Sequence, residues 1–306
     1  MVLYIKVIRG NYMKKSFKYE ILLLMTAMIW GVGFPATKIA INSGFGAFTI
    51  LSGRFVIASI ILTLGFSKQI KYIDKQHIKY GLFAGALLFF GFIFQTYGIM
   101  FTVPSKNAFI TQMMVIFVPF MFWAVYKVRP DKYAFTGAFI ALAGGLVLTY
   151  DSTLGGGINK GDVLTLGCAL LVATHIIASS HFAKKPTTNL IGYTLVQFYV
   201  AAILSLVFAF AIEDVPRVTL IQWWPLLFMG VLNTALGFTI QTYAHKHSTA
   251  TKASIIVSTE AVFASIASVL MVGEIISVQM VLGGALVFIA VLTVETKWRF
   301  IKYGKN

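Results

Sequence analysis

Charge is scarce in this chain. Asp and Glu number 10, Lys and Arg number 25, and charged residues make up only 11% of the 306 positions, against 58% hydrophobic residues. A soluble globular domain has about 25% charged residues, so this composition excludes an ordinary water-soluble globule. The apolar stretches leave no segment long enough to fold as a separate soluble domain. We therefore expect the protein to work inside a membrane.

Several catalytic signatures are also absent. The chain has no Gly-rich loop ending in Lys-Ser or Lys-Thr, which excludes nucleotide hydrolysis within it. It has no His-Glu-x-x-His or paired-aspartate pattern, and no Gly-x-Ser motif within an apolar stretch that faces a histidine. We expect neither an enzyme nor a cofactor or metal. A membrane-embedded enzyme stays open as an alternative. A channel also stays open, although no filter-like loop or ring of charges is present.

Cysteine and histidine give no further site. The single cysteine, Cys168, lies in an apolar run and has no partner for an internal disulfide, so we expect a buried side chain without a reactive role. His245 and His247 lie two positions apart, point to different faces if helical, and predict no metal site. Any energy for the activity must come from a gradient.

Ten apolar stretches fill the chain, separated by short connectors. A helix needs about 20 mostly apolar residues to cross roughly 30 Å of hydrocarbon, and each stretch meets this length. The first stretch is too long for a cleaved signal peptide and is followed by nine more. We predict an all-α membrane protein of ten transmembrane helices, spans 1 to 10, at residues 19–41, 46–66, 78–100, 106–126, 132–150, 161–182, 190–212, 221–244, 252–272 and 277–296.

The basic residues are divided unevenly between the connectors. With a cytoplasmic N-terminus, 20 of the 25 Lys and Arg residues lie in the tails and inner connectors. Because positive charge collects on the cytoplasmic side, we predict cytoplasmic tails at 1–18 and 297–306 in a multi-pass protein of the cytoplasmic (inner) membrane. The basic charge thus reflects topology beside membrane lipid, and no nucleic-acid partner is expected. Met13-Lys14-Lys15 reads as a natural start, so residues 1–12 are expected to be dispensable.

The chain contains an internal repeat. A shift of 146 positions superposes spans 3–5 on spans 8–10 without a gap, placing Gln95-Thr96-Tyr97 on Gln241-Thr242-Tyr243 and Lys106 on Lys252. We predict one five-helix repeat at 19–150 and a second at 161–296. Because each repeat crosses the bilayer five times, an odd number, the second repeat starts on the opposite side of the membrane and is inverted relative to the first. Inverted repeats are the architecture of many secondary transporters, whose halves exchange conformations to open one side and close the other.

These residues, taken in order along the spans, resemble the EamA family of the drug/metabolite transporter (DMT) superfamily over nearly the whole chain. The resemblance implies a ten-span carrier with a central cavity lined mainly by spans 1, 3, 4, 6, 8 and 9. It implies a small-molecule metabolite as cargo, an amino acid or related compound moved outward, by a facilitator or a proton-coupled exchanger. Ala261 stands where the family often has proline, so the sequence does not predict a local kink in span 9. The motifs are Trp30-Gly31 with Phe34 and Lys38, Arg54-Phe55, Gln95-Thr96-Tyr97-Gly98, Ala108-Phe109-Ile110-Thr111, Val118-Pro119, Glu260-Ala261-Val262-Phe263-Ala264 and Gly273-Glu274.

Six side chains within spans are candidates for the substrate cavity. Glu260 lies near the membrane midplane, where an ionised group costs about 2.5–3.5 kcal/mol, and its protonation is a hypothesis for coupling to protons. His175 lies midway along span 6, and Trp30 lies in the middle of span 1, away from the interface where tryptophan collects. Bonding or packing against a neighbouring helix is the alternative for each. The other candidates, expected as gate latches or as partners of neighbouring backbone, are Gln95, Gln112 and Gln241.

Three more polar residues are assigned structural or gating roles. Lys38 stands at the outer end of span 1 and is expected to reach the lipid headgroups. Arg54 begins span 2 with no acidic loop residue near it in sequence, so we expect a bond to a carbonyl or a glutamate on another helix. Glu274 follows span 9 and resembles the acidic residue that ends that helix in the family, which favours a structural role.

Overall fold

A computed structural model of the chain describes residues 2–127, 129–149, 157–183, 189–214, 216–245 and 256–297. Within these ranges eight helices are long and apolar enough to cross a membrane, and two shorter apolar helices cover Lys132–Leu148 and Ile256–Val272. The predicted all-α membrane fold is therefore confirmed. The elements are α1 (Val2–Asn42), α2 (Ala47–Gly65), α3 (Ser67–Ile70), α4 (Lys75–Phe101), α5 (Pro104–Thr111), α6 (Met114–Tyr126), α7 (Lys132–Thr149), α8 (Lys160–Ala183), α9 (Leu190–Ile212), η2 (Leu220–Trp223), α10 (Trp224–Phe228), η3 (Met229–Leu236), α11 (Gly237–His245), α13 (Glu260–Val272) and α14 (Val278–Thr296).

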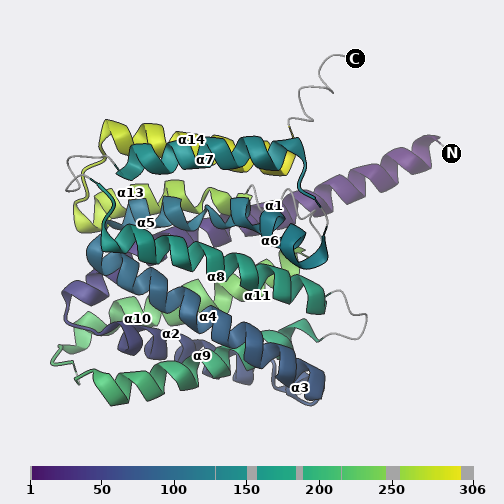
Figure 1. Cartoon of the computed structure of the whole chain (residues 1–306). Helices are drawn as coiled ribbons and strands as arrows, with labels where there is room; N and C mark the ends of the chain where they lie inside the picture. Colours follow the sequence, from purple (N-terminus) through teal and green to yellow (C-terminus); the bar gives the residue numbers. More distant parts are fainter. Residues whose placement is uncertain are drawn as a thin grey trace.

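The long helices lie side by side in one bundle, and successive spans run in opposite directions (Figure 1). The first turns of α1 project beyond the bundle at the end where α14 finishes. An odd number of crossings in each half gives the halves opposite polarity, which agrees with inverted repeats. The main hydrophobic core lies between α2, α4 and α9, around the buried side chains of Phe55, Phe89 and Phe198.

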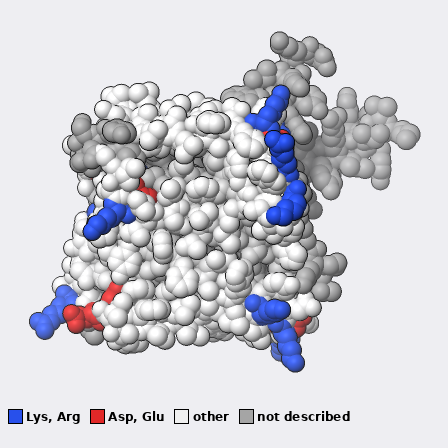
Figure 2. Space-filling view, in the orientation of Figure 1, with Lys and Arg blue, Asp and Glu red and all other residues white. Residues whose placement is uncertain are grey.

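The surface of the bundle is apolar between its two ends. On the face drawn in Figure 2, Lys and Arg gather at the ends of the bundle, and almost no charge lies between them. Large hydrophobic side chains point outward, among them Phe139, Leu270 and Phe210, which are 74%, 79% and 83% exposed. A surface of this extent and polarity fits contact with lipid chains.

Glycines bring two pairs of helices into close contact. A Cβ atom added to Gly144 on α7 would lie 2.8 Å from the carbonyl oxygen of Gly283 on α14, and one added to Gly283 would lie 2.9 Å from that of Gly144. On α4, a Cβ at Gly85 would lie 2.9 Å from the carbonyl oxygen of Gln197 on α9. Small residues at such positions let backbones approach, which supplies much of the packing energy between helices in lipid.

The fourth and ninth spans are both interrupted, and at equivalent places. The fourth span breaks between α5 and α6, where the amide of Met113 donates to the carbonyl of Ile110 at 3.0 Å in an i→i+3 bond. The ninth span breaks at Thr259, whose amide donates to the carbonyl of Ile256 at 3.2 Å. The shift of 146 positions carries the first bond onto the second.

Two further backbone bonds repeat at the same distance along the chain. Ile116 and Phe117 donate to the carbonyl of Met113, at 2.9 and 3.2 Å, and Val262 and Phe263 donate to that of Thr259, at 3.0 and 3.2 Å. The internal repeat therefore extends from the sequence to a specific distortion of the backbone. The ninth span bends without the proline that the family resemblance associates with this position.

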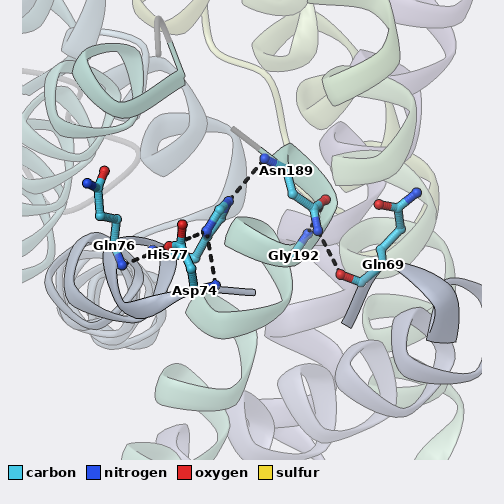
Figure 3. A network of polar contacts seen from close by, with 6 residues as sticks. All are labelled: Gln69, Asp74, Gln76, His77, Asn189 and Gly192. Carbon is cyan, nitrogen blue, oxygen red and sulfur yellow. Dashed lines mark hydrogen bonds and ion pairs between the residues drawn. The ribbon is translucent and has the colours of Figure 1, made fainter. Parts of the chain in front are cut away.

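A polar network at one end of the bundle fastens the turn between α3 and α4 to the start of α9 (Figure 3). Asp74 caps α4 by accepting from the amide of His77 at 3.0 Å, and this contact with His77 lowers the pKa of Asp74. The His77 ring contacts Asp74 through Nδ1 at 2.7 Å and accepts from the amide of Asn189 through Nε2 at 3.0 Å. The Asn189 side chain in turn donates to the carbonyl of Gln69 at 2.7 Å.

Candidate functional site

A buried polar cluster lies where α1, α2 and η3 meet. Its centre is Arg54 on α2, only 6% exposed. Arg54 donates through Nε to the hydroxyl of Thr234 at 2.6 Å and through Nη2 to Oδ1 of Asn233 at 2.5 Å. A buried charge is stable only when polar partners replace its lost hydration, and η3 supplies both. Oδ1 of Asn233 is a side-chain carbonyl oxygen on another helix, so one of the two acceptors is of the predicted kind, and the second is a hydroxyl.

The two acceptors lie in a π-helix. η3 is wound with i→i+5 bonds, a geometry that is rare and often found at functional sites. Asn233 also donates through Nδ2 to the carbonyl of Ile29 at 3.1 Å, and its own carbonyl accepts from the indole of Trp30 at 2.8 Å. The widened turn is therefore tied to α1 on one side and, through Arg54, to α2 on the other.

Aromatic rings surround this cluster. The guanidinium carbon of Arg54 lies 3.9 Å from the centre of the Phe92 ring, which is a cation–π contact. The Trp30 and Phe238 rings have centroids 5.3 Å apart. Trp30, Phe92 and Phe238 are only partly buried, although they contact fully buried residues such as Phe198.

The interrupted fourth and ninth spans contact each other at their breaks. Gln112, in the break between α5 and α6, donates through Nε2 to Oε2 of Glu260, the first residue of α13, at 3.2 Å. Gln112 is 2% and Glu260 9% exposed, and Oε1 of Gln112 is buried without a hydrogen-bond partner among the described residues. No direct ion pair joins Glu260 to Arg54 in the part of the chain that the structure describes.

Of the six residues predicted to line the cavity, the structure brings Trp30 to the Arg54 cluster and brings Gln112 and Glu260 to each other. His175 lies elsewhere, between α8 and α9, with Nε2 2.6 Å from Oε1 of Gln197. Gln95 contacts the hydroxyl of Thr111 at 3.5 Å, which is at the limit of a hydrogen bond. Gln241 is partly buried on α11, and its side chain makes no hydrogen bond to another described residue.

The connection between α4 and α5 is held by Lys38 and Glu274. Lys38 donates through Nζ to the carbonyl of Ile99 at 2.9 Å, so the expectation that it reaches the headgroups is wrong. The last turn of a helix has carbonyls without an intrahelical partner, and Lys38 binds one of them at the end of α4. Glu274, in the connection between α13 and α14, accepts from the amide of Ser105 at 3.3 Å and from its hydroxyl. Burial raises the pKa of Glu274, against the opposing effects of these bonds and of the Lys38 charge.

A buried ion pair at the same end of the bundle was not foreseen. Lys106 on α5 lies 2.8 Å from Asp162 in the first turn of α8, with side chains 1% and 6% exposed. Asp162 also accepts from the amide of Asn159 at 3.2 Å. Every residue of α5 is buried, so α5 and this ion pair close this end of the bundle.

Sequence signals existed for some of the missed residues. Asn233 and Thr234 form a polar pair inside the apolar run of span 8, and Lys106 is one of the positions that the internal repeat duplicates. Cys168 is free and buried, as expected. Among the described residues no three His, Cys, Asp or Glu side chains form a group that could hold a metal ion. His247 and Lys252 lie outside the described residues.

Comparison with known proteins agrees with this architecture. A relative in Archaeoglobus fulgidus, named as an uncharacterized transporter, is 29% identical over 275 residues, which cover 90% of this chain and 85% of the relative. The uncharacterized transporter YoaV of Bacillus subtilis is 24% identical over 277 residues, covering 87% of this chain and 92% of its own. A solved structure titled only as the crystal structure of a protein matches with a TM-score of 0.68 at 16% identity, over 93% of this chain and 98% of that one, and shows the fold alone.

The profile of the EamA-like transporter family matches the chain twice, at residues 17–150 and again at 159–296. These two matches together cover nearly the whole chain, one in each half of the bundle. The protein therefore belongs to the EamA-like transporter family.

Proposed function

We propose that the protein is a secondary transporter that moves an amino acid or related small metabolite outward across the cytoplasmic membrane by alternating access. It acts as a facilitator or a proton-coupled exchanger. The functional units are the five-helix halves at 19–150 and 161–296, with cytoplasmic tails at 1–18 and 297–306. The bundle takes its orientation from the asymmetry of Lys and Arg between the connectors.

The observation that supports this proposal best is the repeated distortion of the fourth and ninth spans. Discontinuous helices at matching places of two inverted repeats are typical of the midplane binding sites of secondary transporters. Here the two breaks contact each other through Gln112 and Glu260. A membrane-embedded enzyme or a channel, the two alternatives, has no comparable need for mirrored breaks.

The closed end fits one state of such a cycle. The buried pair of Lys106 and Asp162, together with Lys38 and Glu274, lies at the end of the bundle that we assign to the outside from the charge asymmetry. We assign this structure to the state closed toward the outside. Release of cargo then requires α5 to separate from α8, which exposes the ion pair to water.

Glu260 is the residue we propose for proton coupling. A glutamine amide both donates and accepts, so Gln112 keeps its contact with Glu260 whether the carboxyl group is ionised or protonated. Protonation removes the charge that attracts Arg54. Cargo and proton then compete for the same carboxylate, which couples the two movements if the transporter is an exchanger.

The test is counterflow in liposomes. The purified protein is reconstituted with one unlabelled L-amino acid inside, and uptake of the same labelled amino acid is measured for all twenty, with nucleosides as a second panel. A carrier shows saturable counterflow, whereas a pore does not. Glu260→Gln is compared with the exposed control Asp214→Asn, with and without a pH gradient. Absence of counterflow for every compound contradicts the transport proposal, and an unchanged response of Glu260→Gln to the pH gradient contradicts proton coupling alone.

A further inference from the structure

We propose that α2 and α9 form a fixed seam on which the two halves of the protein turn. The packing of α7 against α14, at the opposite edge of the bundle, is a second fixed seam (Figure 1). The contacts of both seams are kept throughout the transport cycle, while contacts between the seams are exchanged. This inference rests on the proposed transport by alternating access and identifies the helix contacts that do not open during it.

α2 and α9 are equivalent elements of the two repeats, and they contact each other. A shift of 143 positions superposes α2 on α9 and places Phe55 on Phe198 and Ala58 on Ala201. All four side chains are fully buried in the same core, and the Phe55 and Phe198 rings have centroids 5.9 Å apart. Equivalent residues that contact each other lie beside the twofold axis that relates the halves.

A contact between equivalent residues survives an exchange of conformations between the halves. The exchange replaces each residue of a contact by its counterpart, so the contact of Phe55 with Phe198 becomes the same contact. The pair of Lys106 with Asp162 differs, because the repeat carries Lys106 onto Lys252 and not onto Asp162. That pair is therefore free to open in the other state, whereas Phe55 and Phe198 stay together.

Hydrogen bonds fasten α2 to α9 at both ends of the seam. At the end assigned to the outside, Glu213 follows α9 and accepts from the amides of Phe48 and Thr49 in the first turn of α2, both at 2.8 Å. At the other end, Asn189 precedes α9 and donates to the carbonyl of Gln69 in α3, which follows α2, at 2.7 Å. The amides of a first turn have no intrahelical partner, so separation at Glu213 would cost both bonds.

The contacts of α7 with α14 are reciprocal in the same way. A Cβ atom added to Gly137 would contact Cγ2 of Val294, and one added to Gly283 would lie 2.7 Å from Cγ of Leu148. The shift of 146 positions carries Gly137 onto Gly283 and Leu148 onto Val294, so each contact is the counterpart of the other. The exchange of conformations therefore leaves this pair of contacts in place.

Two fixed seams at opposite edges of the bundle define an axis for the movement. Helices between the seams, such as α5 and α8, separate at one end while their counterparts approach each other at the other end. A turn of the halves about this axis thus opens one side of the membrane as it closes the other, and the buried core around Phe55 stays intact.

The test joins α2 to α9 and measures whether transport continues. In the Cys168→Ala background, cysteine replaces both Thr49 and Glu213 at the outer end, where Oγ1 of Thr49 lies 2.8 Å from Oε2 of Glu213. A second protein has cysteine at Thr63 and Tyr199, whose hydroxyl oxygens lie 2.6 Å apart toward the other end. Each pair is joined with a short bifunctional methanethiosulfonate reagent in proteoliposomes. Counterflow should stay within about twofold of its rate before joining, because residues that keep their distance leave the barrier of the cycle unchanged. Single-cysteine variants treated in the same way are the controls.

The outcomes separate this inference from the transport proposal. Thr63 and Tyr199 take no part in the fastening at either end, so this pair serves even if the loss of Glu213 prevents folding. Counterflow that stops when either pair is joined, and returns after reduction, overturns the inference but leaves the transport proposal standing. Absence of counterflow in the unjoined protein for every compound contradicts the transport proposal.

A second readout needs no transported compound. Spin labels are attached at the same two pairs, and the dipolar broadening of their electron paramagnetic resonance spectra is measured in lipid nanodiscs. Each pair should fit a single distance. Two distances at either pair, which mean that α2 and α9 separate in one state, overturn the inference.

Discussion

Replacing Lys106 by methionine should open the closed end of the bundle. The substitution keeps the apolar length of the side chain but leaves Asp162 buried, at 6% exposure, with its countercharge removed. The remaining polar partners of Asp162 include the amide of Asn159 and the hydroxyl of Thr102, the latter at 3.4 Å. These contacts do not replace a full positive charge at 2.8 Å.

The size of the effect follows from the cost of an unpaired buried charge. Removing one partner of a buried pair costs about 3–5 kcal/mol. The cost falls on the closed state only, because separation of α5 from α8 returns Asp162 to water. At about 1.4 kcal/mol per tenfold change, the equilibrium should shift by roughly 100-fold to several thousandfold toward the state open to the outside. In Lys106→Met with Asp162→Leu no charge remains, and the shift should largely disappear.

The assay is thiol labelling from the outside. Ala108, which lies on α5 and is fully buried, is replaced by cysteine in a Cys168→Ala background. The rate of its reaction with a membrane-impermeant thiol reagent is then measured in right-side-out vesicles. Lys106→Met should raise this rate, and the double substitution with Asp162→Leu should return it toward the starting value. Equal rates in all three proteins would refute the reasoning.

Three further predictions concern stability, each measured as the unfolding temperature of the purified protein. His77→Ala removes the acceptor of a backbone amide at the start of α9 and should cost about 1–3 kcal/mol. Gly283→Leu should lower the free energy of unfolding by about 1–3 kcal/mol or more, because it overpacks α14 against α7. Gly65→Leu is the control and should cost far less, because no atom lies within 4 Å of a Cβ added there. Equal losses of stability in the two variants would contradict the packing argument. Lys297 lowers the pKa of Asp131, so this contact stabilises the fold at pH values above the ordinary carboxyl pKa of about 3.9 and loses its effect as the pH falls through the lowered pKa. Asp131→Asn should therefore reduce the loss of stability in acid. An unchanged dependence of the unfolding temperature on pH would contradict this prediction.

The spans and the repeat were predictable because they depend on composition and spacing. A run of about 20 apolar residues must be helical in lipid, where every backbone polar group needs an internal partner. Two repeats of five spans then leave only the inverted arrangement. Glu260 and Trp30 were proposed as site residues for a related reason, since each is unusual at its expected depth in the membrane.

The partners within the site could not be read from the sequence. Arg54 contacts Asn233 and Thr234 of η3, which is a π-helix, and a local change of helical winding has no reliable sequence signal. The prediction for Lys38 assumed that a basic side chain at a helix end turns toward the headgroups. The carbonyls at the end of α4, such as that of Ile99, are a second kind of partner for such a side chain.

The break in the ninth span shows the same limit. Proline is the strongest sequence signal for a kink, and Ala261 stands at the expected place instead. The helix is nevertheless interrupted at Thr259, whose hydroxyl donates to the carbonyl of Ile256 at 2.6 Å. A side chain that bonds local backbone competes with the regular helical pattern. Only the comparison with Met113 in the other half shows that the interruption belongs to the repeat.

The central claim, that the halves exchange conformations around the buried cluster, is tested most directly by fixing the closed end. Lys106 and Asp162 are both replaced by cysteine in the Cys168→Ala background and joined with a bifunctional methanethiosulfonate reagent in proteoliposomes. Counterflow should cease when the two positions are joined, return after reduction, and persist in each single-cysteine control after the same treatment. Undiminished counterflow through the joined protein would contradict the account.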